Sequence, residues 1–248
     1  MNTPPYFARQ AERGVSLLMV LLVMVLVTLT ALSASRSSFF NESVTSNEAD
    51  YNRALSAAES LIRDAQLDIN GMASDGVSCN WGANFEGCRP SATGTPTLAE
   101  PFFPSDLVLG TAQSSALQTA LNNVCVAGIC APNPWPANAL PPNFWLTPAT
   151  LQSYVNGANG TAATYGQFTR QVPGATGNPI LTAANPARAW YWVELIDFAV
   201  TSCAAVPAQC VNRPIAKLPF IYRITAVARG QRANTMAVIQ TYYVPYPI

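Results

Sequence analysis

The N-terminal part of the chain contains a single run of apolar residues that is far longer than any other. From Gly14 to Ser35 there are 22 residues without a charged side chain, bounded by Arg13 and Arg36. A helix of about 20 apolar residues crosses the roughly 30 Å hydrocarbon core of a bilayer. We therefore predict a membrane-spanning helix from Val15 to about Leu32. A cleaved signal peptide is the alternative, with Ala31 to Ser35 as its cleavage region, although signal peptides have shorter apolar regions.

Beyond this run, apolar side chains return every seven residues, which predicts that the helix continues. Two series form one stripe on a helical surface: Val44, Tyr51, Ala58 and Ala65, and Leu55, Ile62 and Ile69. Charged residues are expected off the stripe: Glu48, Asp50, Arg53, Glu59, Arg63 and Asp64. Gly71 is expected to end the helix, because glycine commonly follows a last helical residue. An unbroken helix from Val15 to Asn70 would be about 84 Å long, and its second half would lay the stripe against a globular head.

The C-terminal part of the chain alternates apolar and polar residues, which is typical of strands. Three segments are predicted as strands: Trp190 to Val200, Phe220 to Val227 and Thr235 to Tyr243. The loop at 228–234 contains Gly230 and would join the last two strands in a hairpin. An antiparallel sheet packed on the helical stripe makes the expected fold class α+β.

Between about Ser74 and Ala189 the sequence is rich in Gly, Pro, Asn, Ala and Thr, which indicates long loops. Two short helices are predicted there, Ser114 to Asn123 and Pro148 to Val155, the second with Thr147 as N-cap and Pro148 as its first residue.

Three aromatic residues in this loop-rich region are unusual for a linker: Trp135, Phe144 and Trp145. They form either a small local core or a binding surface. We favour the local core, because aromatic side chains are more often buried.

Six cysteines form three pairs that are close in the sequence: Cys79 and Cys88, Cys125 and Cys130, and Cys203 and Cys210. We interpret them as disulfides with local pairing, since each pair lies in a Gly-, Pro- or Asn-rich stretch where a small loop closes at modest entropic cost. A structural metal site is the alternative, but zinc sites usually recruit histidine, which this chain lacks.

Disulfides downstream of a membrane segment indicate an oxidising compartment. Arg9 and Arg13 also place the N-terminal end in the cytoplasm.

Charge and residue types exclude several functions. The formal net charge is zero, 10% of the residues are charged, and no basic run exceeds two residues, so the sequence indicates no nucleic-acid partner. Without histidine or a known catalytic motif, we predict that the protein is not an enzyme and uses no cofactor or metal. Glu194 and Asp197 could form a carboxylate pair for acid–base or calcium chemistry. We interpret them instead as charges on the solvent face of a strand.

Arg13 and Gly14, followed by a long apolar helix with an amphipathic continuation, resemble the type IV pilins. Two further stretches are similar to the PilX family of minor pilins: ALSAAESLIRDAQ at Ala54 to Gln66, and FIYRITAVARGQRANTMAVIQTYY at Phe220 to Tyr243. Together these stretches cover less than half of the chain. The region from about Ser74 to Ala189 shows no such resemblance.

The resemblance implies a processing site and a division of the chain. Prepilin peptidase would cleave after Gly14, and Val15 would become the N-methylated first residue. Residues 1–14 would be a leader, 15–36 a transmembrane helix, 37–71 the amphipathic half of the helix, and 72–248 an extracytoplasmic head. Major pilins carry a glutamate at the position of Met19, which implies a subunit near the start or tip of the fibre.

Two classes of function follow. The resemblance implies a PilX-like minor pilin that helps to initiate type IV pilus assembly and supports pilus biogenesis, twitching motility and adhesion. Its partners would be other minor pilins, the major pilin and a PilY-type tip adhesin. It would occupy the inner membrane with its head in the periplasm, and later the pilus fibre at the cell surface. A GspK-like pseudopilin of a type II secretion system is an alternative, and so is a membrane-tethered binding domain whose helix serves only as an anchor.

Overall fold

The computed structural model describes residues 13–77, 88–89, 103, 125–130, 140–158, 160–174, 177–182, 186–197, 214 and 220–245. In chain order its elements are α1 (Arg13–Ile69), β1 (Ile129–Cys130), α3 (Pro148–Asn156), β2 (Gly160–Thr161), β3 (Ala163–Thr164), α4 (Pro179–Thr182), β4 (Ala189–Asp197), β5 (Phe220–Arg229) and β6 (Met236–Tyr243). The chain divides into two compact units, Met1–Ala49 and Asp50–Ile248. The fold class is α+β, as predicted.

The long helix α1 is continuous from Arg13 to Ile69, which confirms the helix predicted over 15–70. Its end is set by Gly71, which has a φ of 61°. The N–H of Gly71 donates to the carbonyl of Asp68 (3.0 Å) and the N–H of Met72 to that of Leu67 (2.9 Å). These two bonds form a Schellman motif, in which a left-handed residue satisfies the last carbonyls of a helix. The predicted stop is therefore correct.

The sheet in the second unit has the order β1-β4-β5-β6, and β3 also pairs with β4. The three long strands are antiparallel: Val193 of β4 lies opposite Ile224 of β5, which in turn lies opposite Thr241 of β6. The short β1 is parallel to β4. The three predicted strands are confirmed, with β5 two residues longer than expected. Residues 198–200 of the first prediction lie outside the described residues, as does the predicted helix at 114–123.

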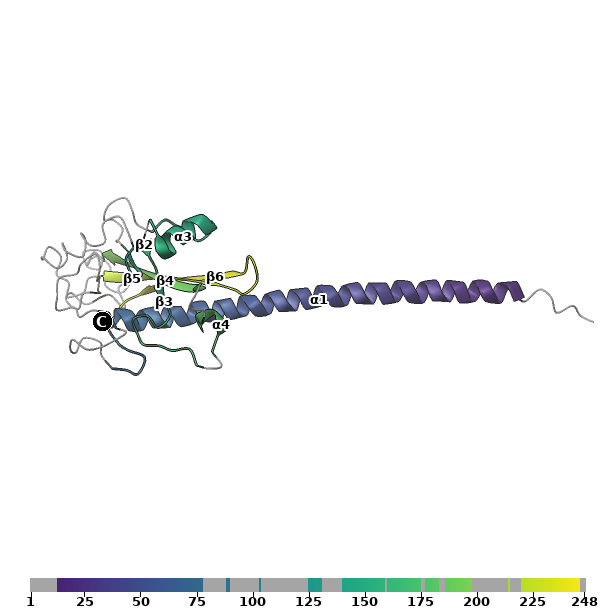
Figure 1. The fold of residues 1–248 in the computed structure, drawn as a ribbon, viewed down its shortest axis with the longest axis horizontal. Coiled ribbons are helices and arrows are strands. Elements are labelled where there is room, and N and C mark those ends of the chain that lie inside the picture. Colours follow the sequence, from purple (N-terminus) through teal and green to yellow (C-terminus); the bar gives the residue numbers. More distant parts are fainter. Residues whose placement is uncertain are drawn as a thin grey trace, which may run out of the picture. The chain divides into compact units, whose positions relative to one another are not determined.

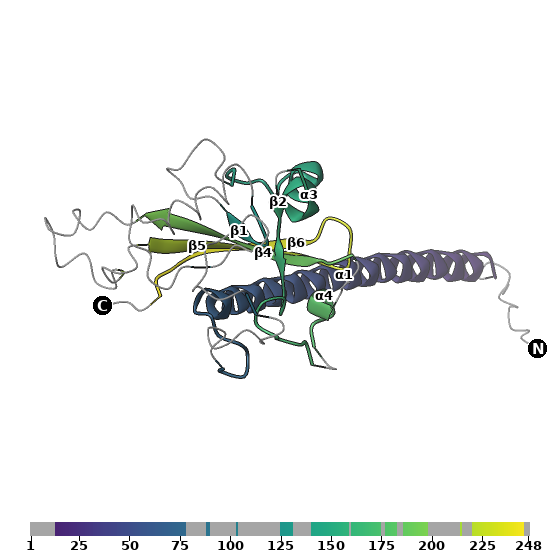
Figure 2. The same cartoon turned by 60° about the vertical axis from the view of Figure 1, so that its left-hand side comes forward.

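The two faces of the sheet carry different layers (Figures 1 and 2). One face packs on the C-terminal part of α1 in a core that includes Leu61, Tyr191 and Ile224. Small residues line both sides of this core, on α1 (Ala54, Ala57, Ala58 and Ala65) and on the strands (Ala189, Ala226, Ala228 and Ala237). Small side chains at facing positions allow the helix and the sheet to interdigitate at close range.

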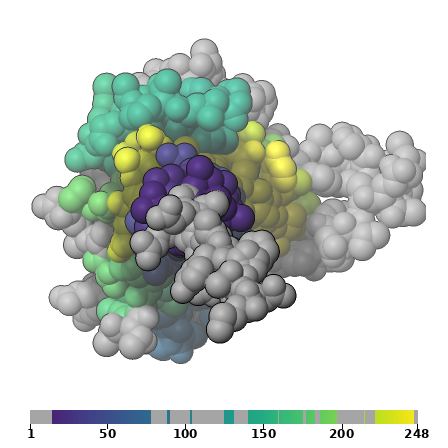
Figure 3. Space-filling view, turned by 90° about the vertical axis from the view of Figure 1, so that its right-hand side faces the viewer, coloured from purple at the N-terminus to yellow at the C-terminus, as the bar shows by residue number. Residues whose placement is uncertain are grey.

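The opposite face carries a second core, built around Trp192, Phe144 and Leu151 of α3. Phe144 packs edge-to-face on Trp192 with ring centroids 4.8 Å apart, and Trp145 is partly buried beside it. The local core that we expected for these aromatics is therefore present, while Trp135 lies outside the described residues. In the space-filling view of Figure 3, the teal segment that includes α3 adjoins the yellow β5–β6 hairpin.

α3 begins where the sequence predicted. Thr147 is the N-cap residue and Pro148 follows it. The hydroxyl of Thr147, however, donates to the hydroxyl of Thr150 (2.7 Å) and does not cap the backbone.

The predicted apolar stripe on α1 is partly wrong. Ala58, Ala65 and Ile69 are buried, but Val44 and Tyr51 are each 47% exposed. Asp50 and Asp64, which we expected on the outside, are 2% and 1% exposed. The true buried face carries small apolar residues together with aspartates, because the head supplies hydrogen-bond partners for these carboxylates.

Candidate functional site

The predicted processing site lies at the N-terminal end of α1. The helix begins at Arg13, so Gly14 and Val15 fall in its first turn. α1 is the single helix in the described part of the chain that is long and apolar enough to cross a membrane. Its most apolar 18-residue window has a mean hydropathy of 2.8 and none of it is buried within the protein. A surface of this kind requires lipid or other apolar helices as its surroundings.

In the second unit, three aspartates on one face of α1 each hold a different segment of the head. Asp68 pairs with Arg89, whose Nε lies 2.7 Å and 2.9 Å from the two carboxylate oxygens. The hydroxyl of Tyr191 donates to the same carboxylate (2.8 Å). Arg89 also donates to the carbonyl of Ala127 (2.6 Å), and its guanidinium lies 3.8 Å from the ring centroid of Phe168. Helix, sheet and two loops therefore meet at one buried ion pair.

Asp64 lies one turn earlier and holds the loop that follows β3. It accepts hydrogen bonds from the N–H of Gly166 (2.8 Å) and from the hydroxyl of Thr169. Thr169 also forms an isolated β-bridge with Cys88, which precedes Arg89 in the sequence. The two aspartates thus hold neighbouring parts of the same structure.

Asp50 holds the hairpin loop between β5 and β6. Its two carboxylate oxygens accept from the N–H groups of Gln231 and Arg232, each at 2.9 Å. Gly230 is required here, because an added Cβ would collide with the Asp50 carboxylate and lie 2.7 Å from Cβ of Thr235. The hairpin loop therefore fits closely against the helix.

The three carboxylates differ in acidity. Burial raises the pKa of Asp64 to about 6, although Thr169 and Gly166 oppose the rise. Burial also raises the pKa of Asp68, against the lowering effects of Arg89 and Tyr191. Burial alone would raise the pKa of Asp50, but the hydrogen bonds from 232 and 231 outweigh it and lower the pKa.

The structure contains a disulfide between Cys125 and Cys130, with an S–S length of 2.03 Å. Cys88 is also disulfide-bonded. Cys79, Cys203 and Cys210 lie outside the described residues, so the other two predicted pairings stay predictions.

The interpretation of Glu194 as a charge on a solvent face is wrong. Glu194 is 1% exposed, and its carboxylate accepts two hydrogen bonds from Arg223, at 2.7 Å and 2.6 Å. The two residues are directly opposite in the β4–β5 register, which the sequence alone did not reveal. Burial raises the pKa of Glu194, and the salt bridge opposes this rise. Glu194 is therefore part of a structural ion pair. The side chain of Asp197 lies outside the part of the chain that the structure describes.

Sequence reasoning missed Asp68, Arg89 and Thr169 as contact residues. A signal existed: the buried positions 50, 54, 57, 61, 64 and 68 are spaced alternately by four and three residues, which is the spacing of one helical face. Aspartate obscures this signal, because it is rarely buried in proteins.

The comparisons with known proteins agree with this architecture. The model of the PilX N-terminal region matches residues 13–63, the greater part of α1. The model described as type IV pilus assembly protein PilX, C-terminal, matches residues 87–245, which is more than half of the chain. The chain belongs to the PilX family. No curated protein and no solved structure matches it.

Membership of the PilX family makes this chain a type IV pilus assembly protein, in a structural family, as the resemblance implied. The C-terminal match extends through the loop-rich region at 87–189, for which the sequence showed no resemblance. The apolar first half of α1 fits a membrane-anchored pilin that interacts with other pilus components.

Proposed function

We propose that this PilX-family chain is a minor pilin that helps to initiate type IV pilus assembly and remains near the tip of the fibre. Its leader, residues 1–14, is removed by prepilin peptidase after Gly14, and Val15 is then N-methylated. Residues 15–36 anchor it in the inner membrane with the head in the periplasm. Through contacts with other minor pilins, the major pilin and a PilY-type tip adhesin it supports twitching motility and adhesion.

The observation that carries this proposal is the exposure of the first half of α1. Every large apolar side chain from Val15 to Leu32 is about half exposed or more, with Leu17 at 73%. At about 25 cal/mol per Å², burying such a surface in lipid or between helices is strongly favourable. The same helix continues into the head, so a packing surface and a folded domain belong to one element. A mere anchor would not require that continuity.

Met19 supports the position near the tip. A glutamate at this position could neutralise the terminal amine of a neighbouring subunit within the lipid, where an unpaired charge is costly. Met19 cannot supply this pairing to the subunit beside it. A subunit that lacks the pairing is better suited to a place with few neighbours than to repeated use along the fibre.

The processing step is tested by mass spectrometry of the protein extracted from membranes. We expect a mature chain that begins with N-methylated Val15. A Gly14→Leu variant should keep residue 1 as its start, because a branched side chain blocks the cleavage position, whereas Ser38→Leu should be processed normally. A native chain that starts at Met1 would contradict the pilin proposal, and a start near Ser35 would indicate a signal peptide.

The position in the fibre is tested by quantitative mass spectrometry and immunogold labelling of sheared pili. We expect a few copies per fibre, with labels at one end. Even labelling along the fibre would overturn the tip position while leaving the pilin proposal intact.

The role of the helix is tested by exchanging residues 1–36 for an unrelated membrane anchor. Pilus number and twitching should then fall to the level of the deletion strain, although the head remains folded in the periplasm. A head that still supports pili on a foreign anchor would favour a tethered binding domain instead.

A further inference from the structure

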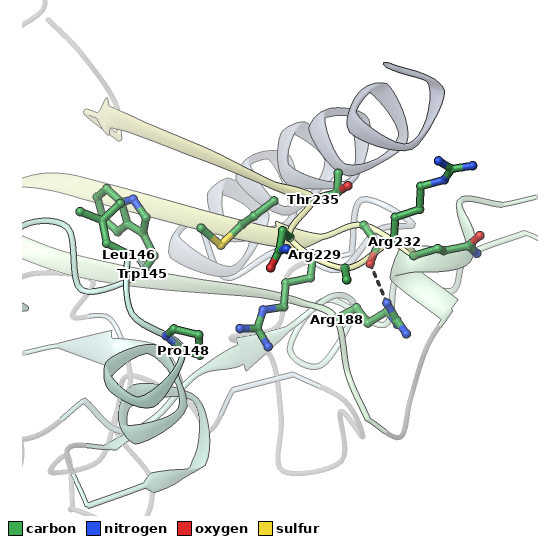
Figure 4. Close-up of a pocket in the computed structure, with 12 residues that line it drawn as sticks. Trp145, Leu146, Pro148, Arg188, Arg229, Arg232 and Thr235 are labelled. Carbon is green, nitrogen blue, oxygen red and sulfur yellow. Dashed lines mark hydrogen bonds between the residues drawn. The ribbon is translucent and has the colours of Figure 1, made fainter. Parts of the chain in front are cut away.

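The sheet face opposite α1 contains a cavity of about 560 Å³ beside the β5–β6 hairpin. Figure 4 shows its two walls. One wall is apolar, with Trp145, Leu146 and Pro148 before and at the start of α3. The other carries Arg188, Arg229 and the hairpin loop. No acidic residue lines the cavity in the described part of the chain.

Two arginines in this cavity lie opposite each other, Arg188 immediately before β4 and Arg229 at the end of β5. Ala189 is the register partner of Ala228, and one position further the N–H of Arg229 donates to the carbonyl of Arg188 (2.7 Å). Like charges directly opposite across a strand pair are destabilising. The register therefore brings two like charges to this end of the sheet.

The other end of the same sheet face provides a contrast. In β4 and at the residue before it, positions 188, 190, 192 and 194 share this face, because side chains alternate along an extended chain. At position 194 the opposite arginine, Arg223, is neutralised by Glu194 at 2.6 Å. Arg188 occupies the position opposite Arg229 that corresponds to Glu194, and as an arginine it cannot neutralise Arg229. Among the described residues no carboxylate neutralises this end of the sheet face, so it can accommodate a negative charge supplied by a ligand.

The positive end of this face is held in place before any ligand arrives. Nη1 of Arg188 donates to the carbonyl of Gly230 (2.6 Å), and Asp50 holds the following loop residues. The acid nearest to the loop is thus committed to backbone N–H groups. Among the described residues, the guanidinium of Arg229 has no hydrogen bond and no ion pair. Its five donors form a planar arrangement that suits a carboxylate.

The apolar wall restricts the ligand further. Leu146 is 69% exposed, and Trp145 is fixed edge-to-face against Phe144, with ring centroids 5.2 Å apart. A small anion would leave this wall in contact with water. Pockets that combine apolar walls with a few convergent polar groups generally bind ligands of the same mixed character.

We propose that this pocket binds an acidic peptide segment of a partner protein. A carboxylate of the peptide is bound by Arg229 and Arg188, and an adjacent apolar side chain packs on Trp145 and Leu146. Arginine pairs with a carboxylate through two parallel hydrogen bonds, which gives both affinity and orientation. The proposal does not depend on where in the fibre the protein acts.

The test is isothermal titration calorimetry of the full chain in detergent micelles with the peptide acetyl-Glu-Leu-Glu-Leu-amide. Its counterpart acetyl-Gln-Leu-Gln-Leu-amide should bind at least about tenfold more weakly, because charge-assisted hydrogen bonds are lost. Arg229→Ala should weaken binding of the acidic peptide by a similar factor, and Arg229→Lys should recover only part of it. Arg63→Ala, which removes an exposed arginine from α1, should leave binding unchanged.

The apolar wall is tested separately. Leu146→Ser should weaken binding of the leucine-containing peptide but not that of acetyl-Glu-Gly-Glu-Gly-amide. Thermal unfolding of Arg229→Ala should be unchanged or shifted upward, because a like-charge pair is removed, so loss of binding cannot be ascribed to loss of the fold.

Several results would overturn the proposal. They are no measurable heat with the wild type at millimolar peptide, equal binding of the glutamine peptide, and equal loss in Arg229→Ala and Arg63→Ala. Binding only of inorganic phosphate would indicate a simple anion site. Arg229-dependent binding of phosphatidylglycerol vesicles without peptide binding would indicate a lipid surface instead.

Discussion

The two halves of α1 have the same backbone conformation but opposite relations to their surroundings. In the first half, large apolar side chains are exposed on every side, from Val25 at 48% to Leu17 at 73%. In the second half, Ala57, Leu61 and three aspartates are almost completely buried. The half that looks most like a protein core is thus the exposed one, and charged residues are buried in the other.

This contrast teaches that polarity alone does not tell which side of a helix is buried. The uniform first half fits surroundings of lipid or other apolar helices, because such an environment has no preferred direction. The second half has one buried face because its carboxylates accept hydrogen bonds from particular donors of the head: Arg89, Tyr191 and Gly166. Changes to the buried ion pairs should therefore alter the stability of the head. A charge added to the uniform half should instead alter membrane insertion.

The largest effect is expected from Asp68→Ala. It leaves the guanidinium of Arg89 buried without its carboxylate, which should lower the free energy of unfolding by about 3–5 kcal/mol. Urea denaturation followed by tryptophan fluorescence measures it. Glu59→Ala, on the exposed side of the same helix, should change stability by less than about 0.5 kcal/mol. Replacing the pair together by Asp68→Leu and Arg89→Met should restore part of the loss, and failure to do so would show that the cost does not come from the unpaired charge.

A charge in the uniform half should reduce membrane insertion of the helix and leave the stability of the head unchanged. Val23→Arg should disfavour insertion by about 3–4 kcal/mol, because arginine at the centre of a span is costly. A membrane-insertion assay on the full chain measures this, and Glu42→Arg, beyond the span, is the control. The unfolding midpoint of the head should stay the same. A lower midpoint in Val23→Arg would mean that the first half also stabilises the head.

Asp64 should make stability depend on pH. Its folded pKa of about 6 lies above the ordinary aspartate pKa of 3.8, so the folded state binds the proton more tightly than the unfolded state. Stability should therefore rise as the pH falls through about 6, with the gain complete below about 4 and at most about 3 kcal/mol. Asp64→Asn should remove this part of the pH dependence between pH 4 and 6, whereas Glu59→Gln should not. Identical profiles for Asp64→Asn and the wild type would contradict the assigned acidity.

The smallest effect is expected from the alanines that allow close packing. Ala57→Leu should lower the free energy of unfolding by about 1–3 kcal/mol, because the added atoms enter a filled core between α1 and the sheet. Ser56→Leu introduces the same side chain on the exposed side and should be nearly neutral. Thermal unfolding compares the two. Equal stability would show that the helix–sheet spacing can adjust.

Much of the architecture could be predicted because it depends on local pattern. The 22 uncharged residues before Arg36 predicted the apolar first half of α1, Gly71 predicted the helix end, and alternation predicted the three long strands. The cores were harder. Phe144 and Trp145 could be assigned to a local core only from the general tendency of aromatic residues, since nothing in the sequence pointed to Trp192 as their partner.

The rotation of the helix in the head could not be predicted, and the reason is physical. Placing Val44 and Tyr51 on the buried stripe follows from hydrophobicity, whereas burying Asp64 and Asp68 is favourable only if donors are available. Those donors come from residues 21 to 123 positions away in the sequence. The same is true of Glu194, whose neutralising partner Arg223 depends on strand register.

By itself, then, the sequence determined the apolar first half of the long helix, the helix as a whole, the strands and the resemblance to the PilX family, because each depends on residues that are near neighbours or on a repeated local pattern. Only the tertiary structure decided which face of the helix is buried, which charges are neutralised, and that Arg188 and Arg229 share a cavity with Trp145. A charge inside a protein is stabilised or destabilised by whatever lies within a few ångströms, and that is a property of the folded chain.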